Sequence, residues 1–289
     1  MDKVIWREGK IETFRNAMPV QFAHHLSMDR PEDHVLHINN YIEIYVFVSG
    51  NHKYVVEDRL YDLQRGDIIV INPLEVHKAL PMQEGMYERF YFLMDVACLD
   101  GMVNNPLSRF LNRSGGEGNL ISPLGNARAR ILDILYATSA CFEAEKNDQL
   151  RAFGLMVQFL GELISQLQPG ATQPDGGDRS PELLDRILTY VAKNTATIQS
   201  VSQIAEALGV SPQYLSAYFA KRIGTPLKIF VQAKKIALAK QLLSKGADVT
   251  GACFDSGFND CSYFIRIFKK YVGVTPLRFK QTHTQRAIQ

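Results

Sequence analysis

The N-terminal third of the chain alternates short apolar runs with turn residues, which is typical of β-strands. Between about Val20 and Asp95, runs rich in β-branched and aromatic residues end at Gly, Asn, Asp or Pro. The predicted strands are 42–48, 53–57, 60–63, 68–71 and 87–93. Many short strands at close spacing predict an antiparallel barrel or jelly roll for this region.

The hydrophobic period changes beyond residue 126. Apolar residues recur at steps of three and four over 127–142 and over 150–167, which predicts two antiparallel helices that form a helical hairpin. The apolar seam of the second helix consists of Leu150, Phe153, Val157, Leu160, Ile164 and Leu167. Its spacing suits a helix-pairing surface, so this seam could form a dimer contact. Packing against the chain's own β domain is the alternative.

The stretch 168–178 contains several Pro and Gly residues and no apolar periodicity, which predicts a flexible linker. Ser180 and Pro181 then have the residue types of an N-cap and of a first helical position. Helical sequence follows to the end of the chain, interrupted at five glycines. We therefore expect an α+β chain of two domains, 1–167 and 181–289, joined by a linker at 168–180.

A repeat marks the last quarter of the chain. Tyr214-Leu215-x-x-x-Phe219-x-Lys221-x-x-Gly224 recurs 49 residues later as Tyr263-Phe264-x-x-x-Phe268-x-Lys270-x-x-Gly273. Each copy follows a Gly-containing turn and a further helical segment. A helix, a tight turn and a second helix form a helix-turn-helix, whose second helix lies in the DNA major groove. An all-α C-terminal domain with two such motifs is predicted.

Apolar residues at steps of four assign the buried face of each second helix and leave the other face for DNA. The residues predicted to face DNA are Gln213, Ser216, Ala217 and Lys221 in the first motif and Cys261, Ser262, Ile265, Arg266, Lys269 and Lys270 in the second. Arg266 is the best candidate for a base contact because its planar guanidinium suits guanine. A phosphate contact or a surface ion pair is the alternative for Arg266.

Charge supports this division of the chain. Residues 1–170 contain 16 Lys and Arg against 22 Asp and Glu, a net charge of −6, whereas residues 171–289 contain 16 against 8, a net charge of +8. A basic C-terminal part predicts that only this part contacts phosphates.

Other features exclude several classes of protein. The four cysteines form no C-x-x-C pair, and we interpret them as reduced thiols without a disulfide framework or zinc site. The N-terminus lacks a signal-peptide pattern, and no apolar run approaches transmembrane length. A cytoplasmic location and no membrane partner are expected.

The second motif resembles the signature of the AraC/XylS family of bacterial transcription regulators. The similar residues are Gly257-Phe258, Tyr263-Phe264, Phe268-Lys269-Lys270, Gly273 and Thr275-Pro276. The resemblance covers about 181–282 and departs from the family at Gly251-Ala252-Cys253, where the family usually has Ile-Ala followed by small residues. It implies a homodimeric regulator of promoter DNA, an activator rather than a repressor, that works with RNA polymerase and answers to a small-molecule effector such as a sugar.

The N-terminal part is similar, less closely, to the cupin-type sensor domain of the same family. The residues that carry this similarity are His37, Glu43, Gly50, Arg65-Gly66-Asp67, Asn72-Pro73 and His77. Metal-binding cupins have a second His where this chain has Asn39, so we expect no metal and no cofactor. His37, Glu43, Tyr45 and His77 would instead line a pocket for a polar metabolite. In the alternative, these side chains satisfy one another and bind nothing. His24, His25 and His34 are interpreted as surface or loop residues.

Two other functions stay open. One is a cupin metalloenzyme fused to a DNA-binding module, which Asn39 disfavours, so no enzyme activity is expected. The other is a constitutive regulator whose sensor domain has no effector.

Overall fold

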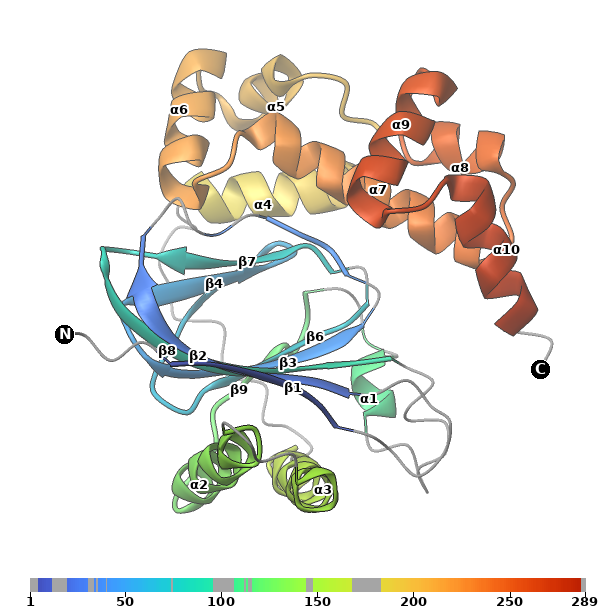
Figure 1. Cartoon of the computed structure of the whole chain (residues 1–289). Coiled ribbons are helices and arrows are strands. Elements are labelled where there is room, and N and C mark those ends of the chain that lie inside the picture. The colour runs from blue at the N-terminus through green and yellow to red at the C-terminus, as the bar shows by residue number, and fades with distance from the viewer. Residues whose placement is uncertain are drawn as a thin grey trace.

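Four layers are visible in Figure 1: a helical domain, a small sheet, a larger sheet and a helical hairpin. The computed structural model describes residues 5–11, 20–30, 34, 36–39, 41–73, 75–95, 107–111, 113, 116–143, 148–167 and 183–286. The predicted linker at 168–180 lies outside the described residues. The domain boundaries therefore stay predictions.

The strands form a six-stranded and a three-stranded antiparallel sheet. The larger sheet has the order β1 (Ile5–Ile11), β2 (Val20–Asp29), β8 (Gly85–Met94), β3 (Ile42–Ser49), β6 (Ile68–Ile71) and β9 (Leu120–Ile121). The smaller sheet has the order β5 (Arg59–Asp62), β4 (His52–Val56) and β7 (His77–Pro81). The five predicted strands are confirmed, whereas β1, β2, β7 and β9 were not predicted from the sequence.

The prediction of an α+β chain is confirmed, but the two sheets are not closed into a barrel. Across the described strands, no ladder joins an edge of one sheet to an edge of the other. The sheets instead pack face to face, so the N-terminal domain is a jelly-roll-like sandwich. The space between the two inner faces takes the place of a barrel interior.

Strand β3 explains why the apolar run at 42–48 is nearly continuous. Ile44 and Val46 pack toward the helical hairpin, whereas Tyr45 and Phe47 pack toward the smaller sheet. A strand buried on both faces has no polar face to alternate with. Tyr45 therefore lies in the sandwich interior.

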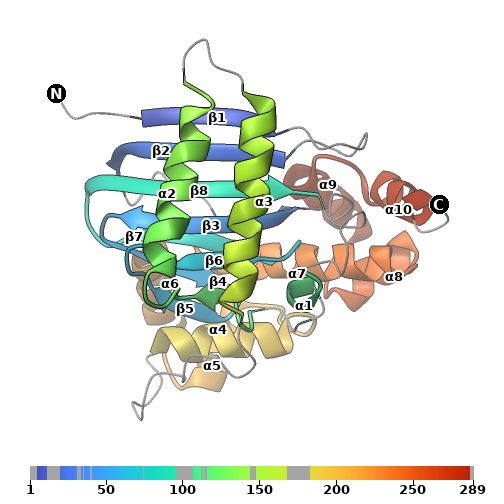
Figure 2. The same cartoon turned by 90° about the horizontal axis from the view of Figure 1, so that it is seen from below.

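Helices α2 (Ala127–Ala140) and α3 (Gln149–Ser165) form the predicted hairpin, which crosses the outer face of the larger sheet (Figure 2). Short helix α1 (Ser108–Leu111) precedes them. Helix α3 buries Ala152, Met156, Phe159, Leu160 and Leu163. Leu150 and Val157 of the predicted seam are 72% and 47% exposed, so they do not pack on the chain's own sheet.

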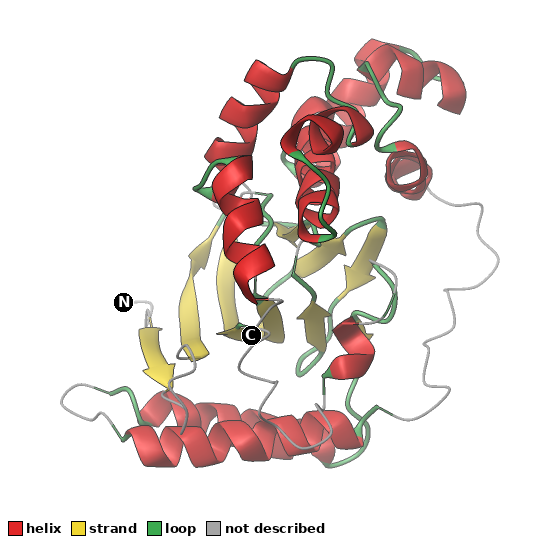
Figure 3. Cartoon of the chain, turned by 90° about the vertical axis from the view of Figure 1, so that its right-hand side faces the viewer, coloured by secondary structure: helices red, strands yellow, loops and turns green. Residues whose placement is uncertain are grey.

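The helical domain lies on the opposite side of the sandwich from the hairpin (Figure 3). Its helices are α4 (Leu183–Asn194), α5 (Val201–Leu208), α6 (Pro212–Ile223), α7 (Leu227–Ser244), α8 (Val249–Asp255), α9 (Cys261–Val272) and α10 (Pro276–Arg286). Pairs α5–α6 and α8–α9 are the two predicted helix-turn-helix motifs, and α7 connects them. The all-α tandem arrangement is confirmed.

Candidate functional site

Helix α6 has the geometry expected of a recognition helix. Gly209 ends α5 with a φ of +70°, a left-handed conformation that costs little only for glycine. Ser211 then caps α6 by accepting a hydrogen bond from the Tyr214 amide at 3.2 Å. Leu215 and Phe219 are fully buried. The predicted DNA-facing residues Gln213, Ser216, Ala217 and Lys221 are all exposed.

Helix α9 repeats this arrangement. The Asp260 carboxylate caps it, accepting hydrogen bonds from the amides of Ser262 at 2.8 Å and Tyr263 at 3.0 Å. Phe264 and Phe268 face the core. The predicted residues Ser262, Ile265, Arg266, Lys269 and Lys270 are exposed. The Arg266 guanidinium lies 5.4 Å from the centre of the Tyr263 ring, at the outer surface of the helix.

Cys261 differs from the other predicted DNA-facing residues. It is half-buried and lies against Cys253 of α8. Burial, together with a hydrogen bond to Cys261, raises the pKa of the Cys253 thiol to about 12. Cys261 therefore belongs to the packing between α8 and α9 as much as to the outer face.

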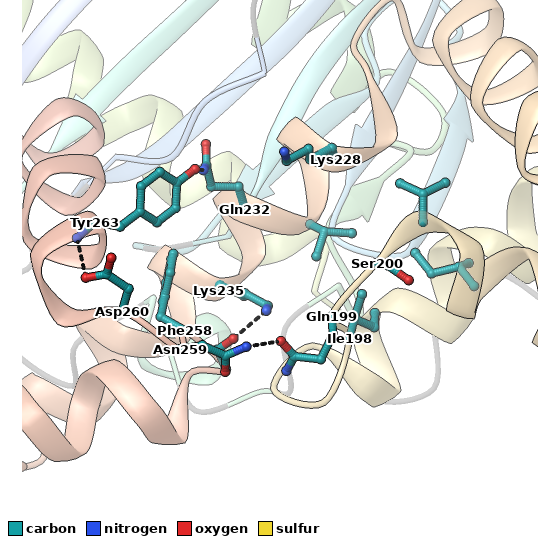
Figure 4. Close-up of a pocket in the computed structure, with 14 residues that line it drawn as sticks. Ile198, Gln199, Ser200, Lys228, Gln232, Lys235, Phe258, Asn259, Asp260 and Tyr263 are labelled. Carbon is teal, nitrogen blue, oxygen red and sulfur yellow. Dashed lines mark hydrogen bonds between the residues drawn. The ribbon is translucent and has the colours of Figure 1, made fainter.

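The two motifs are joined at a groove of about 240 Å³ between α5, α7 and the α8–α9 turn (Figure 4). Asn259 donates a hydrogen bond to the Gln199 side chain at 2.7 Å across this junction. Lys235 Nζ donates to the Gly257 carbonyl at 2.5 Å. A Cβ on Gly257 would lie 2.2 Å from the Ala196 carbonyl oxygen, so this position requires glycine. These contacts set the angle between the two motifs.

Not all the positive charge of the helical domain can reach DNA. Lys234, Lys235 and Lys240 on α7 are buried. Lys234 pairs with Glu57 of the sandwich, and burial lowers the pKa of Lys240 to about 7. The net charge counted from the sequence therefore overstates the charge available to phosphates.

In the sandwich interior, three of the predicted effector residues converge. His77 Nε2 lies 3.1 Å from a Glu43 carboxylate oxygen, and His77 Nδ1 lies 2.8 Å from the Glu75 carbonyl oxygen. The His37 and His77 ring centres are 4.1 Å apart. Asn39 donates to the same Glu43 oxygen at 3.1 Å. His37 is exposed whereas Glu43 and His77 are buried, so the cluster extends from the interior to the surface.

The two buried groups form an ion pair. Burial alone would raise the pKa of Glu43, but the adjacent His77 lowers it below its ordinary value. Burial alone would lower the pKa of His77, but Glu43 raises it above its ordinary value. His37, Glu43 and His77 could together offer three ligand atoms to a metal ion, so the expectation of no metal at this donor set stays a prediction. Asp29, His34 and His52 form a second group of potential metal donors.

Tyr45, the fourth predicted effector residue, lies in the same interior, where its hydroxyl is 2.5 Å from that of Tyr87. Tyr54, Tyr87 and Arg89, which were not among the predicted site residues, lie beside Tyr45 in this interior. The ring of Tyr54 packs against that of Tyr45 in a tilted arrangement with centres 4.6 Å apart, and Arg89 lies over the Tyr87 ring at 4.4 Å. The period-two spacing of Tyr87 and Arg89 on β8 was the signal available in the sequence.

The interpretation of His24 and His25 as surface residues is wrong. Both lie on β2 and are 1% and 2% exposed. His24 bonds Ser139 at 2.8 Å and Glu88 at 2.9 Å. Burial lowers the pKa of His25 to about 4. His34 is a half-buried loop residue whose Nε2 lies 2.7 Å from Asp29.

The sandwich and the helical domain share one apolar cluster. Leu36, Ile38, Val55, Val76 and Leu80 pack with residues of the helical domain. Lys78 of β7 is 1% exposed, and its Nζ donates to the carbonyl of Ile223 at 2.7 Å and to Thr225 at 3.4 Å. The C-terminal end of α6 is therefore attached to the outer face of β7.

Within the described part of the chain, no helix is both long and apolar enough to cross a membrane.

Comparisons with known proteins agree with these two regions. The family model of a helix-turn-helix domain matches residues 204–282, and that of an AraC-like ligand binding domain matches residues 21–160. The HTH-type transcriptional activator RhaR of Escherichia coli (strain K12) is 21% identical over 258 residues, which span 86% of this chain and 88% of RhaR.

Two solved structures also show similarity to this chain. The C-terminal domain of the two-component response regulator yesN from Fusobacterium nucleatum is 31% identical and covers 32% of this chain and 93% of its own, with a TM-score of 0.31. ToxT from Vibrio cholerae O395 is 14% identical and covers 91% of this chain and 98% of its own, with a TM-score of 0.36.

Proposed function

We propose a specific function for this chain from the premise that it belongs to the AraC/XylS family of DNA-binding transcription regulators. It acts as an activator that binds promoter DNA and responds to a small polar metabolite, with a carbohydrate as the first class to test. The RhaR relatives are named transcriptional activators, which supports this sign of regulation. The family also disfavours a metalloenzyme fused to a DNA-binding module.

The observation that carries DNA binding is the pair of capped helices α6 and α9, each exposing one face opposite its buried residues. In this proposal each helix places its N-terminal half in a major groove, and the two grooves lie on one side of the duplex. Gln213, Ser216, Ala217, Ser262, Ile265 and Arg266 face base edges, and Lys221, Lys269 and Lys270 face phosphates. Cys261 contributes at the first turn of α9.

The effector binds between the two sheets, beside His37, Glu43, Tyr45 and His77. Aromatic rings and paired polar groups line this space, which suits a ligand with both hydroxyl groups and apolar faces. A hydroxylated ligand would exchange hydrogen bonds with Glu43 and His77, whose present partners are each other.

Strand β7 links the effector to the helical domain. His77 faces the interior cluster, whereas its neighbour Lys78 holds the end of α6. A ligand that rearranges His77 therefore shifts the position of β7 and, with it, the equilibrium between arrangements of the DNA-binding motifs.

Dimerisation and location complete the proposal. The exposed apolar residues Leu150 and Val157 on α3 supply a face for a second copy of the chain, which gives a homodimer. The dimer acts in the cytoplasm and recruits RNA polymerase to the promoter.

Selection of bound duplexes from a random DNA library by the full-length protein tests this function. We expect two preferred elements about one helical turn apart, and binding that weakens steeply with salt. Selected duplexes with no common element, or binding insensitive to salt, would refute it.

A constitutive regulator is the second candidate, since the pairing of Glu43 with His77 leaves these groups satisfied without a ligand. A thermal-shift screen of neutral sugars and sugar acids against the full-length protein separates the two, because an effector that binds the folded state raises its melting temperature.

A further inference from the structure

Arg89 occupies the inner face of the central part of the sandwich. On β8 it lies opposite His25 of β2 and opposite Phe47 of β3. Its guanidinium lies over the ring of Tyr87, 4.4 Å from the centre. Tyr87 in turn stacks on His52 of the smaller sheet at 3.6 Å. The arginine therefore lies among the side chains that line the proposed effector site.

Among the residues that the structure describes, no carboxylate forms an ion pair with Arg89. Its Nη1 is shielded from solvent and has no hydrogen-bond partner among the residues that the structure describes. Two buried carboxylates of the described residues, Asp29 and Glu43, contact histidines instead. Asp29 lies 2.7 Å from both His34 and His52, and Glu43 pairs with His77.

The field of this arginine reaches the proposed site. Burial raises the pKa values of Tyr45, Tyr54 and Tyr87, and the positive charge of Arg89 opposes that rise at all three hydroxyls. Arg89 is half-buried, and shielding part of a cation without a counter-ion has a cost that a ligand of opposite charge would offset. The guanidinium presents two parallel N–H donors, which match two oxygens of a carboxylate or phosphate.

We propose that Arg89 binds the anionic oxygens of the effector, so that this regulator responds to a small acid, a carboxylate or a phosphate ester, rather than to a neutral metabolite. This inference rests on the proposed function, because it assigns a ligand class to the same interior site. The hydroxyls of Tyr45 and Tyr87 and the Glu43–His77 pair would then contact the uncharged part of the ligand. A sugar acid or a sugar phosphate combines both kinds of group.

The test uses the full-length protein and small probes that need no knowledge of the effector. Melting temperature is measured with rising acetate or inorganic phosphate, at ionic strength held constant with sodium chloride, and with acetamide as the uncharged match for acetate. At probe concentrations a few times the dissociation constant, acetate or phosphate should raise the melting temperature by about 1–4 °C, and acetamide should not.

Two variants separate this site from general anion effects. Arg89→Met should lose the response, whereas Arg30→Met, which removes a surface arginine paired with Glu84, should keep it. In chloride alone, Arg89→Met should melt no lower than the wild type, because it removes a charge that no carboxylate of the described residues pairs with, while methionine can still pack on the Tyr87 ring. If Arg89 served only to stabilise the fold, Arg89→Met would melt at a lower temperature than the wild type.

The proposal is overturned if neither anion stabilises the wild type more than chloride, if acetamide stabilises it equally, or if Arg89→Met keeps the response. If Arg89→Met does not fold, Arg89→Gln takes its place. The comparison of acetate with acetamide on the wild type tests the proposal without any variant. DNA binding is measured on the same samples. Intact DNA binding without an anion response refutes the acidic effector alone, whereas loss of DNA binding by the wild type refutes the proposed function.

Discussion

Replacement of Lys78 by methionine should loosen the helical domain from the sandwich without unfolding either. Methionine fills the space of the buried lysine stem but cannot donate to the Ile223 carbonyl, which Lys78 reaches at 2.7 Å. A hydrogen bond from a charged donor contributes about 1.5–3 kcal/mol. Burial lowers the pKa of Lys78, which shows that the buried ammonium has a desolvation cost that offsets part of this contribution.

The net weakening of the contact is therefore about 1–2 kcal/mol, which raises the population of undocked molecules about 5- to 30-fold. Hydrogen exchange measures this population directly, since amides protected only by docking exchange in proportion to it. We expect faster exchange at the C-terminal end of α6 and in the turn around Glu57, whose carboxylate pairs with Lys234. Amides in the centre of β3 should be unchanged.

Lys228→Met is the matched control, because Lys228 is an exposed lysine of α7. It should leave exchange at α6 and at Glu57 as in the wild type. Equal exchange in wild type and Lys78→Met would show that Lys78 does not hold the two domains together. Faster exchange throughout β3 would show instead that the substitution damages the sandwich.

Three further predictions test the DNA face, the interior ion pair and the dimer. Arg266→Ala should reduce the preference for one base at one operator position by about 1–3 kcal/mol. Lys269→Ala should weaken binding to all DNA sequences equally and reduce the dependence of binding on salt, which competition binding at several salt concentrations measures. Glu43→Gln should destabilise the protein by about 3 kcal/mol at about pH 5.5 in urea unfolding. Because the folded protein lowers the pKa of Glu43, the stability that this carboxylate contributes is lost as pH falls below 4.5. Because the folded protein raises the pKa of His77, the stability that this imidazole contributes is present below pH 6.5 and is lost at higher pH. The destabilisation by Glu43→Gln should therefore be smaller on both sides of the window between these two pH values. Leu150→Glu should convert the proposed dimer to a monomer in sedimentation velocity without unfolding the chain, because Leu150 is 72% exposed within one chain; a variant that stays dimeric excludes this face.

The helix-turn-helix motifs could be predicted from the sequence because their determinants are local. Ser211 and Asp260 cap the helices that follow them within three residues, and Gly209 ends the preceding helix. Apolar residues at steps of four then assign the buried face without any knowledge of the partner helices. Cys261 shows the limit of this reasoning, because its burial depends on Cys253 in a different helix.

The interior of the sandwich could be predicted only in part. Glu43 and His77 were found from their spacing within a known kind of motif, and they do meet at 3.1 Å. Arg89, Tyr87 and His52 come from strands of both sheets, so their meeting depends on which strands face one another. A strand pattern gives the alternation of faces but not the pairing of distant strands, so it predicts a barrel or a jelly roll without deciding between them.

The contact between the two domains also joins residues that are distant in the sequence, and it suggests how an effector could act on the DNA-binding motifs. Successive residues of a strand point to opposite faces, so adjacent positions 77 and 78 of β7 serve different partners. His77 is held by Glu43 in the interior, and Lys78 holds the carbonyl of Ile223 at the end of α6. Any ligand that displaces His77 must move the backbone or break the pair, and either change acts one residue away from the attachment of a recognition helix. Coupling of this kind needs no long pathway through the core. It predicts that substitutions at 78 alter the response to an effector without altering the affinity of the interior of the sandwich for that effector.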